Sequence, residues 1–132
     1  TYGVLTVGAN TSRGILTISG ANTFSSMTIG SGNTLSCTVN VTQTISGAST
    51  FTGTVSDPVG LIVSDLSNGN PATLSFSAGS STMEYGTVCG ITTTGSGTFV
   101  ATNSFNNGRN TFDTGDSVSA PTVGGAVGVI GG

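Results

Sequence analysis

The chain has 132 residues, a formal net charge of −3 and a composition dominated by Gly, Ser and Thr. Its cationic side chains are Arg13 and Arg109, and it contains no His, Lys or Trp. A basic patch that neutralises phosphates is therefore excluded, which argues against a nucleic-acid partner. The lack of His excludes catalysis and metal binding of the kinds that need an imidazole. No apolar run in the sequence approaches the ~20 residues of a membrane-spanning helix.

A short repeat occupies the beginning of the chain. Three similar triplets follow one another at intervals of 11 residues: Leu5-Thr6-Val7, Leu16-Thr17-Ile18 and Met27-Thr28-Ile29. The alternation of apolar and polar residues predicts half-buried strands, and the Gly and Asn residues after each triplet predict tight turns. Such a unit cannot bury its own apolar face, so copies must stack on neighbours in the same chain or in another.

Two all-β architectures without a substantial helix fit this pattern of short repeated strands. One is a β-solenoid, or an intertwined multi-chain β-helix, with Thr on the outside. The other is a jelly-roll-like β-sandwich that contains a meander of short antiparallel strands. The sequence leaves both open.

The repeat fades after about residue 56, where Asp57-Pro58 predicts a turn. Further strands are expected at 61–63, 73–77, 83–91 and 98–101. Residues 105–112 predict a β-hairpin with Asn107-Gly108 as its type I′ turn. The chain is therefore expected to be one all-β domain over 1–132, or a repeat segment over 1–56 followed by a non-repeating β head over 57–132.

Both ends of the chain carry segments suited to assembly with another copy. Apolar residues alternate with small or polar ones near the start, and others stand among glycines near the end. The expected assembly residues are Tyr2, Val4, Leu5, Val7, Val123, Val127, Val129 and Ile130. A chain with so few charged side chains has few gatekeepers against edge-to-edge strand pairing.

The two cysteines, Cys37 and Cys89, predict a disulfide. Closing a loop of about 50 residues would stabilise the fold by about 4 kcal/mol in the chain-entropy model. The alternative is a pair of free thiols, but the remaining composition resembles that of extracellular proteins, in which disulfides persist.

Candidate functional side chains are few. Asp113 and Asp116 could hold Ca²⁺ together with backbone carbonyls, but Asp beside Gly is also a common turn former. Glu84 could act as a general acid with a partner such as Asp65, although nothing in their spacing brings them together. We therefore expect no catalytic residue, no metal and no cofactor.

The surface offers two further kinds of candidate site. Asn10 and Asn40 stand in acceptor patterns for N-glycosylation. Thr6, Thr17 and Thr28 share one phase of the repeat, and a regular array of threonines is suited to ice or to sugar surfaces. The alternative is that Thr simply combines solubility with a preference for strands.

The repeats from residue 3 to residue 56 resemble the Leu-Thr-Val-x-Gly repeats of fibre proteins from tailed phages and large DNA viruses. They are also similar, more weakly, to passenger-domain repeats of bacterial autotransporters. The fibre resemblance implies elongated β-structure, homo-oligomers and attachment to a surface. A further analogy is with pilin-like subunits, which polymerise by lending a terminal strand to a neighbour.

These observations lead to one preferred function and one alternative. The preferred one is a non-enzymatic structural subunit of a self-assembling fibre or filament, extracellular or on a virion surface, with an adhesion role toward surface glycans. Its partners would be copies of itself, with no nucleic acid and no membrane span. The alternative is a monomeric carbohydrate- or ice-binding β-domain that uses a face rich in Thr and Asn.

Overall fold

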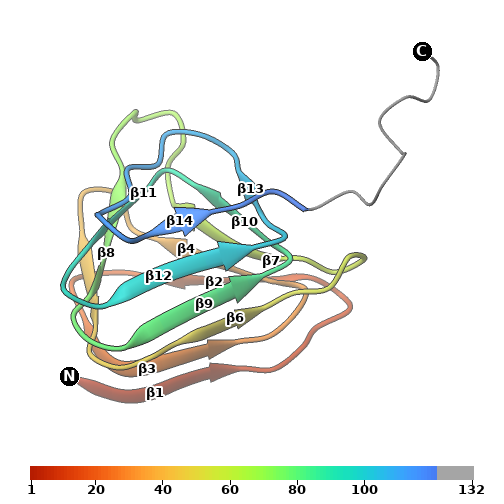
Figure 1. The fold of residues 1–132 in the computed structure, drawn as a ribbon, viewed down its shortest axis with the longest axis horizontal. Helices are drawn as coiled ribbons and strands as arrows, with labels where there is room; N and C mark the ends of the chain where they lie inside the picture. The colour runs from red at the N-terminus through yellow and green to blue at the C-terminus, as the bar shows by residue number, and fades with distance from the viewer. Residues whose placement is uncertain (122–132) are drawn as a thin grey trace.

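The computed structural model describes residues 1–121, which form strands and turns without a helix in this range. Every ladder between these residues is parallel, and it joins strands that lie one coil apart in the chain. The chain therefore winds in stacked coils, from the N-terminal coil at the bottom of Figure 1 to the C-terminal coil at the top. The expectation of an all-β fold without substantial helix is confirmed.

The strands belong to two sheets. Nine strands form the larger one: β1 (Tyr2–Val7), β3 (Thr23–Ile29), β5 (Thr42–Ile45), β6 (Thr50–Thr52), β8 (Ala72–Phe76), β9 (Ser80–Glu84), β11 (Ile91–Thr94), β12 (Thr98–Thr102) and β14 (Ser117–Val118). Five strands form the other, which we call the back sheet: β2 (Gly14–Ile18), β4 (Asn33–Cys37), β7 (Val59–Val63), β10 (Gly86–Cys89) and β13 (Phe105–Asn106).

The nine-stranded sheet presents two faces because β3 has different partners at its two ends. Thr23 and Phe24 pair with β5, whereas Thr28 and Ile29 pair with β6. We call the start of β3 with β5, β8 and β11 the side face. The front face consists of β1, the end of β3, β6, β9, β12 and β14. In Figure 1 the front face is turned to the viewer, β8 and β11 stand at the left, and the back sheet lies behind.

The core lies inside the coils, where alternate residues of each strand turn their side chains inward. Phe51, Phe76 and Phe99 are fully buried there. The rings of Phe76 and Phe99 stack at 5.2 Å between centroids, and Phe51 meets Phe99 edge-on at 6.0 Å. The buried apolar cluster contains residues from both 1–56 and 57–121, so one core runs through the described coils.

Buried polar side chains join successive coils at the corners. Gln43 is fully buried. Its Nε2 donates to the carbonyl oxygen of Gly20 at 2.6 Å, and its Oε1 accepts from the amide of Asn22 at 3.1 Å. The hydroxyl of Ser49 accepts from the amide of Met27 at 2.8 Å in the same way. Backbone groups that leave the ladders at the corners are thus satisfied by the next coil.

The 11-residue repeat corresponds to half a coil. Leu5-Thr6-Val7 in β1 pairs with Met27-Thr28-Ile29 in β3, 22 positions later on the front face. Leu16-Thr17-Ile18, the copy between them, lies in β2 of the back sheet and pairs with residues 35–37 of β4. Successive repeats therefore lie on different sheets, and alternate repeats stack.

The hairpin expected over residues 105–112 is wrong. Phe105–Asn106 pairs in parallel with β10, and Thr111 forms a parallel bridge with Thr92. The chain bends instead at Gly108 and Arg109, which have φ values of 100° and 60°, and the amide of Gly108 donates to Asn106 Oδ1 at 3.0 Å. The expected type I′ turn is also wrong, because that turn needs a positive φ at both central residues and Asn107 does not have one. Each flanking segment pairs with the preceding coil instead of with the other segment.

Candidate functional site

The first coil leaves one edge of each sheet open. Within residues 1–121, β1 pairs with β3 alone and β2 with β4 alone. The carbonyl oxygen of Val7 accepts from the amide of Gly30 at 2.7 Å, so the backbone of Val7 faces β3. Because the backbone groups of alternate strand residues point to opposite sides, those of Tyr2, Val4 and Thr6 point away from β3.

The same reasoning applies to β2. The carbonyl oxygen of Ile18 accepts from the amide of Thr38 at 3.3 Å, so Ile18 faces β4. The backbone groups of Ile15 and Thr17 then point away from it. We call the resulting set the open edge: Tyr2, Val4, Thr6, Ile15 and Thr17.

The open edge has exposed apolar side chains and no charged one. The exposed fractions are 59% for Tyr2, 61% for Val4 and 72% for Ile15. The ring of Tyr2 stacks on Phe24 at 5.5 Å between centroids, and no described residue stacks on its other face. An unpaired strand edge without charged residues is a template for pairing with another chain.

At the opposite end of the coil stack, where β11, β13 and β14 are the last strands within residues 1–121, polar side chains bond to the preceding coil. Asp116 accepts from the amide of Phe99 at 2.8 Å and from the hydroxyl of Thr93 at 2.6 Å. Asn110 accepts from the amide of Ile91 at 2.8 Å and donates to the carbonyl oxygen of Val88 at 2.9 Å. Asp116, a candidate calcium ligand from the sequence, here binds backbone and hydroxyl groups of the preceding coil.

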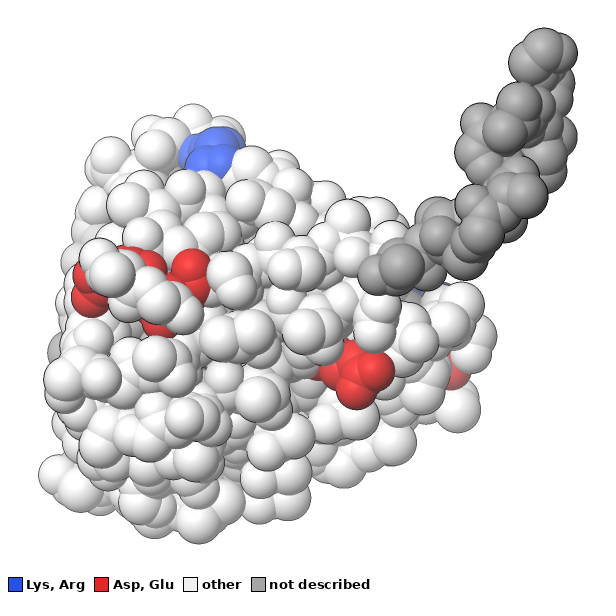
Figure 2. All heavy atoms as spheres, in the orientation of Figure 1, with Lys and Arg blue, Asp and Glu red and all other residues white. Residues whose placement is uncertain are grey.

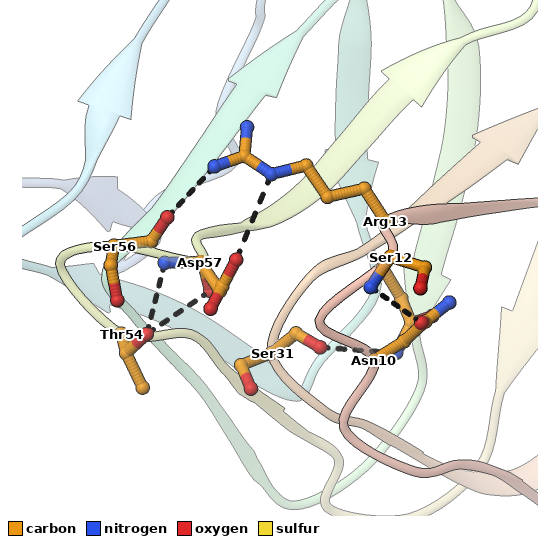
Figure 3. Close-up of polar contacts among 8 residues, drawn as sticks. Asn10, Ser12, Arg13, Ser31, Thr54, Ser56 and Asp57 are labelled. Atoms are coloured by element: carbon orange, nitrogen blue, oxygen red, sulfur yellow. Dashed lines mark hydrogen bonds and ion pairs between the residues drawn. The ribbon is translucent and has the colours of Figure 1, made fainter.

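Arg13 ties the loop before β2 to a later loop (Figure 3). Its Nη2 donates to the carbonyl oxygen of Ser56 at 2.8 Å, and its Nε lies 3.7 Å from Asp57 Oδ1. Asp57 is held in turn because its amide donates to the hydroxyl of Thr54 at 3.0 Å. The guanidinium of Arg13 is therefore turned toward the loop at Ser56 and Asp57.

Two adjoining hollows lie on the outer surface of the back sheet. A cavity of about 330 Å³ lies between Val55, Pro58, Tyr85, Phe105 and Pro121, and the polar side chains of Thr54, Thr87 and Asn103 also line it. A second, of about 260 Å³, extends toward Arg13 and Ile15 and shares Pro58 and Thr87 with the first. We call the two together the back-sheet groove.

The back-sheet groove is hollow where its floor lacks a side chain at Gly60. Thr34, Gly60 and Thr87 occupy one register position on three neighbouring strands. A Cβ on Gly60 would lie 2.7 Å from the hydroxyl oxygen of Thr34, so a larger residue would displace its neighbour. The hollow thus follows from a missing side chain in the middle of the sheet.

Three non-glycine residues that line the groove have positive φ: Arg13 (59°), Tyr85 (50°) and Asn103 (49°). Asn tolerates this left-handed conformation, but a bulky residue such as Tyr does so at a cost. Strain of this kind is concentrated at binding and catalytic sites, which marks Tyr85 as a candidate functional residue.

The expected disulfide between Cys37 and Cys89 is absent, and both thiols are free. Cys37 lies in β4 and Cys89 in β10, with β7 between them. Two strand spacings are about 10 Å, beyond the ~7 Å over which a disulfide can join two Cα atoms. The two residues also occupy alternate register positions, opposite Val63 and Ile62, so their side chains leave opposite faces of the sheet. Burial raises the pKa of Cys37 to about 12.

The other carboxylates considered from the sequence do not form a pair. Glu84 lies on the front face and accepts from Asn103 Nδ2 at 3.4 Å. Asp65 follows β7 of the back sheet, and the hydroxyl of Ser67 lowers its pKa by donating to it. A lowered pKa keeps this carboxyl ionised, which is the opposite of what a general acid needs.

The two candidate glycosylation sites lie at corners of the coils. Asn10 is half-buried, and its Oδ1 accepts from the amide of Ser12 at 2.9 Å. Asn40 is exposed and has a φ of 62°. Of the expected assembly residues, Leu5 and Val7 are half-buried against the core, whereas Val123, Val127, Val129 and Ile130 lie outside the described residues.

The sequence analysis missed the back-sheet groove. Tyr85, Phe105 and Pro58 come from three different coils, and no local pattern joins them. The nearest signal is Gly60, which interrupts an apolar strand where a β-branched residue would otherwise fit.

Comparisons with protein families, with curated proteins and with solved structures find no match for this chain. No helix in residues 1–121 is long and apolar enough to cross a membrane.

Proposed function

We propose that this chain is a non-enzymatic structural subunit of a self-assembling fibre or filament, extracellular or on a virion surface. The observation that carries the proposal is the asymmetry of the coil stack. One end presents the open edge, which has exposed apolar side chains and no charged one, whereas near the other end Asn110 and Asp116 bond to the preceding coil. Terminal coils of a monomeric repeat protein need polar caps, which the open edge lacks.

Assembly would proceed by adding a strand of another copy to the open edge. The backbone groups of Tyr2, Val4 and Thr6 supply the hydrogen bonds, and the free face of the Tyr2 ring offers an aromatic anchor. A filament needs a head-to-tail contact between two different surfaces, whereas two open edges that meet each other would stop at a dimer. We therefore assign the donor role to the segment with Val123, Val127, Val129 and Ile130.

The test uses Val4→Pro, measured by light scattering over a series of protein concentrations. Proline removes an amide that points away from β3, so it blocks the open edge without removing a bond to β3. We expect the wild-type mass to rise with concentration and the variant to stay monomeric. Val4→Thr, which keeps the amide, is the control and should assemble like the wild type. A wild-type monomer at every concentration, or equal assembly of Val4→Pro, would contradict the proposal.

The adhesion role of such a fibre is best assigned to the back-sheet groove, with surface glycans as ligands. Tyr85 and Phe105 offer aromatic surfaces for the apolar faces of sugar rings. Asn103 and Thr87 offer donors and acceptors for sugar hydroxyls at the same place. A glycan array probed with the wild type tests this assignment, and Tyr85 is the residue on which it depends most.

A further inference from the structure

The side face carries a two-column array of hydroxyl side chains that no sequence repeat reveals. Thr42, Thr73, Thr92 and Thr111 stand opposite one another on successive coils and form the first column. Thr23, Thr44, Ser75 and Thr94 form the second column, two positions further along the strands. We call these eight residues the side-face array.

The side chains of the array point outward. Every member is exposed or half-buried. The residues between the columns, Gln43, Leu74 and Thr93, are buried, as the alternation of a strand requires. Each strand thus contributes a pair of outward side chains separated by one inward residue.

The composition of the chain does not account for this regularity, because the other faces break it. On the front face the corresponding outward positions include Val4, Glu84 and Val100 among the threonines. On the back sheet they include Ile15, Gly60 and Cys89. The side-face array has seven Thr and one Ser, and its nearest carboxylate in sequence, Asp113, lies beyond its end.

Inward residues of the same strands fix the strands that carry the array. Gln43 bonds to the corner at Gly20 and Asn22, which fixes β5 against the first coil. Phe76, two residues after Leu74, stacks on Phe99 in the core. Strands in register on a packed core hold their outward side chains at fixed spacings, about 4.8 Å between strands and about 6.7 Å along each strand.

We propose that the side-face array binds the surface of ice. Oxygen atoms on the flat faces of ice crystals repeat at distances similar to these two spacings. Each Thr supplies a hydroxyl for a surface water and a methyl group that fills the space between neighbouring waters. A neutral array suits a neutral lattice, since a fixed charge would order water in a different pattern.

A crystalline polysaccharide is the less suitable ligand for this face. Sugar rings pack against aromatic side chains, and the outward positions of the array contain none. The proposal also does not depend on assembly of the chain, because one copy contains all eight residues.

The test measures incorporation of the full chain into slowly growing ice, together with thermal hysteresis and crystal shape. Thr92→Lys places a long charged side chain in the middle of the array, and Thr42→Lys does so at an exposed member. Thr50→Lys makes the same change at an exposed outward position of the front face. Circular dichroism melting checks that all three variants remain folded.

We expect the wild type and Thr50→Lys to enter the ice and to shape its crystals. Thr92→Lys and Thr42→Lys should lose activity by about tenfold or more, which corresponds to about 1.4 kcal/mol of binding free energy. Exclusion of the wild type from ice, or equal loss in all three folded variants, would overturn the proposal. Retention on insoluble cellulose or chitin without incorporation into ice would also overturn it, in favour of a polysaccharide.

Discussion

Tyr85 is held in a left-handed conformation at the corner between β9 and β10, where its ring lines the back-sheet groove. At the corner that follows β12, Asn103 adopts the same conformation. In these two coils the corner has a positive φ, which Asn adopts with less strain than Tyr. The presence of Tyr is best explained by what its ring does in the groove.

Tyr85→Asn separates the strain from the function. We expect the free energy of unfolding to change by no more than about 1 kcal/mol, because relief of the left-handed strain offsets the lost contacts of a half-buried ring. Glycan binding should fall to background on the same array. Tyr85→Phe, which keeps the ring, should bind glycans whose contact is stacking alone. Unchanged glycan binding by Tyr85→Asn would contradict the assignment of glycan binding to the back-sheet groove.

At the residue scale the sequence predicts inward and outward positions well, but not which positions meet. The inward members of the repeats, such as Met27 and Ile29, are buried as their alternation indicates. The prediction of a disulfide was wrong because it was inferred from the number of cysteines and from composition. Neither of these contains information about strand register. Only the pairing of β4, β7 and β10 shows that Cys37 and Cys89 lie two strands apart.

At the scale of elements, the pattern of alternation locates strands but does not assign them to sheets. Leu16-Thr17-Ile18 resembles Leu5-Thr6-Val7 closely, yet the two triplets lie on different sheets. Pairing is set by the number of residues in a full coil, and this number varies because the loops differ in length. Thr28 and Thr50 are 22 positions apart, whereas Thr50 and Thr82 are 32 apart.

The side chain of Gln43 in β5 bonds to the corner at Gly20 and Asn22. The variant Gln43→Leu tests how much these hydrogen bonds stabilise the fold. Leucine fills a similar volume but leaves the carbonyl of Gly20 and the amide of Asn22 without their partner. We expect the free energy of unfolding to fall by about 2–4 kcal/mol, since each unsatisfied group costs about 1–3 kcal/mol. Chemical denaturation measures the change.

Thr44→Val is the matched control, because Thr44 is the next residue along β5 and points outward. It should alter stability by no more than about 0.5 kcal/mol. Equal stability of the Gln43→Leu variant and the wild type would show that the corner is held by the ladder alone.

The whole molecule is asymmetric along the axis on which its coils stack. Its surface carries few charges, and Figure 2 shows them as small separate patches on the face in view. Near one end Asn110 and Asp116 bond to the preceding coil, whereas the open edge at the other end has no charged side chain. This contrast between the ends, more than composition, favours assembly over an isolated domain.

The sequence predicted the all-β class and the need for stacking. Its assignment of Tyr2 and Val4 to assembly stays a prediction, and both side chains are exposed on β1. The sequence did not predict that Asp116 bonds to the preceding coil, because Asp113 and Asp116 fit turn formers and calcium ligands equally well. It also did not predict the groove or the side-face array, because both combine residues from several coils. Features built across coils become visible only when the ladder register is known.

Negative-stain electron microscopy of the purified 132-residue chain, at concentrations where light scattering detects assembly, tests the central claim most directly. We expect filaments of uniform width, joined end to end through the open edge. Single particles the size of one chain at every concentration would contradict self-assembly. Closed dimers would contradict the head-to-tail contact and would show that two open edges pair with each other.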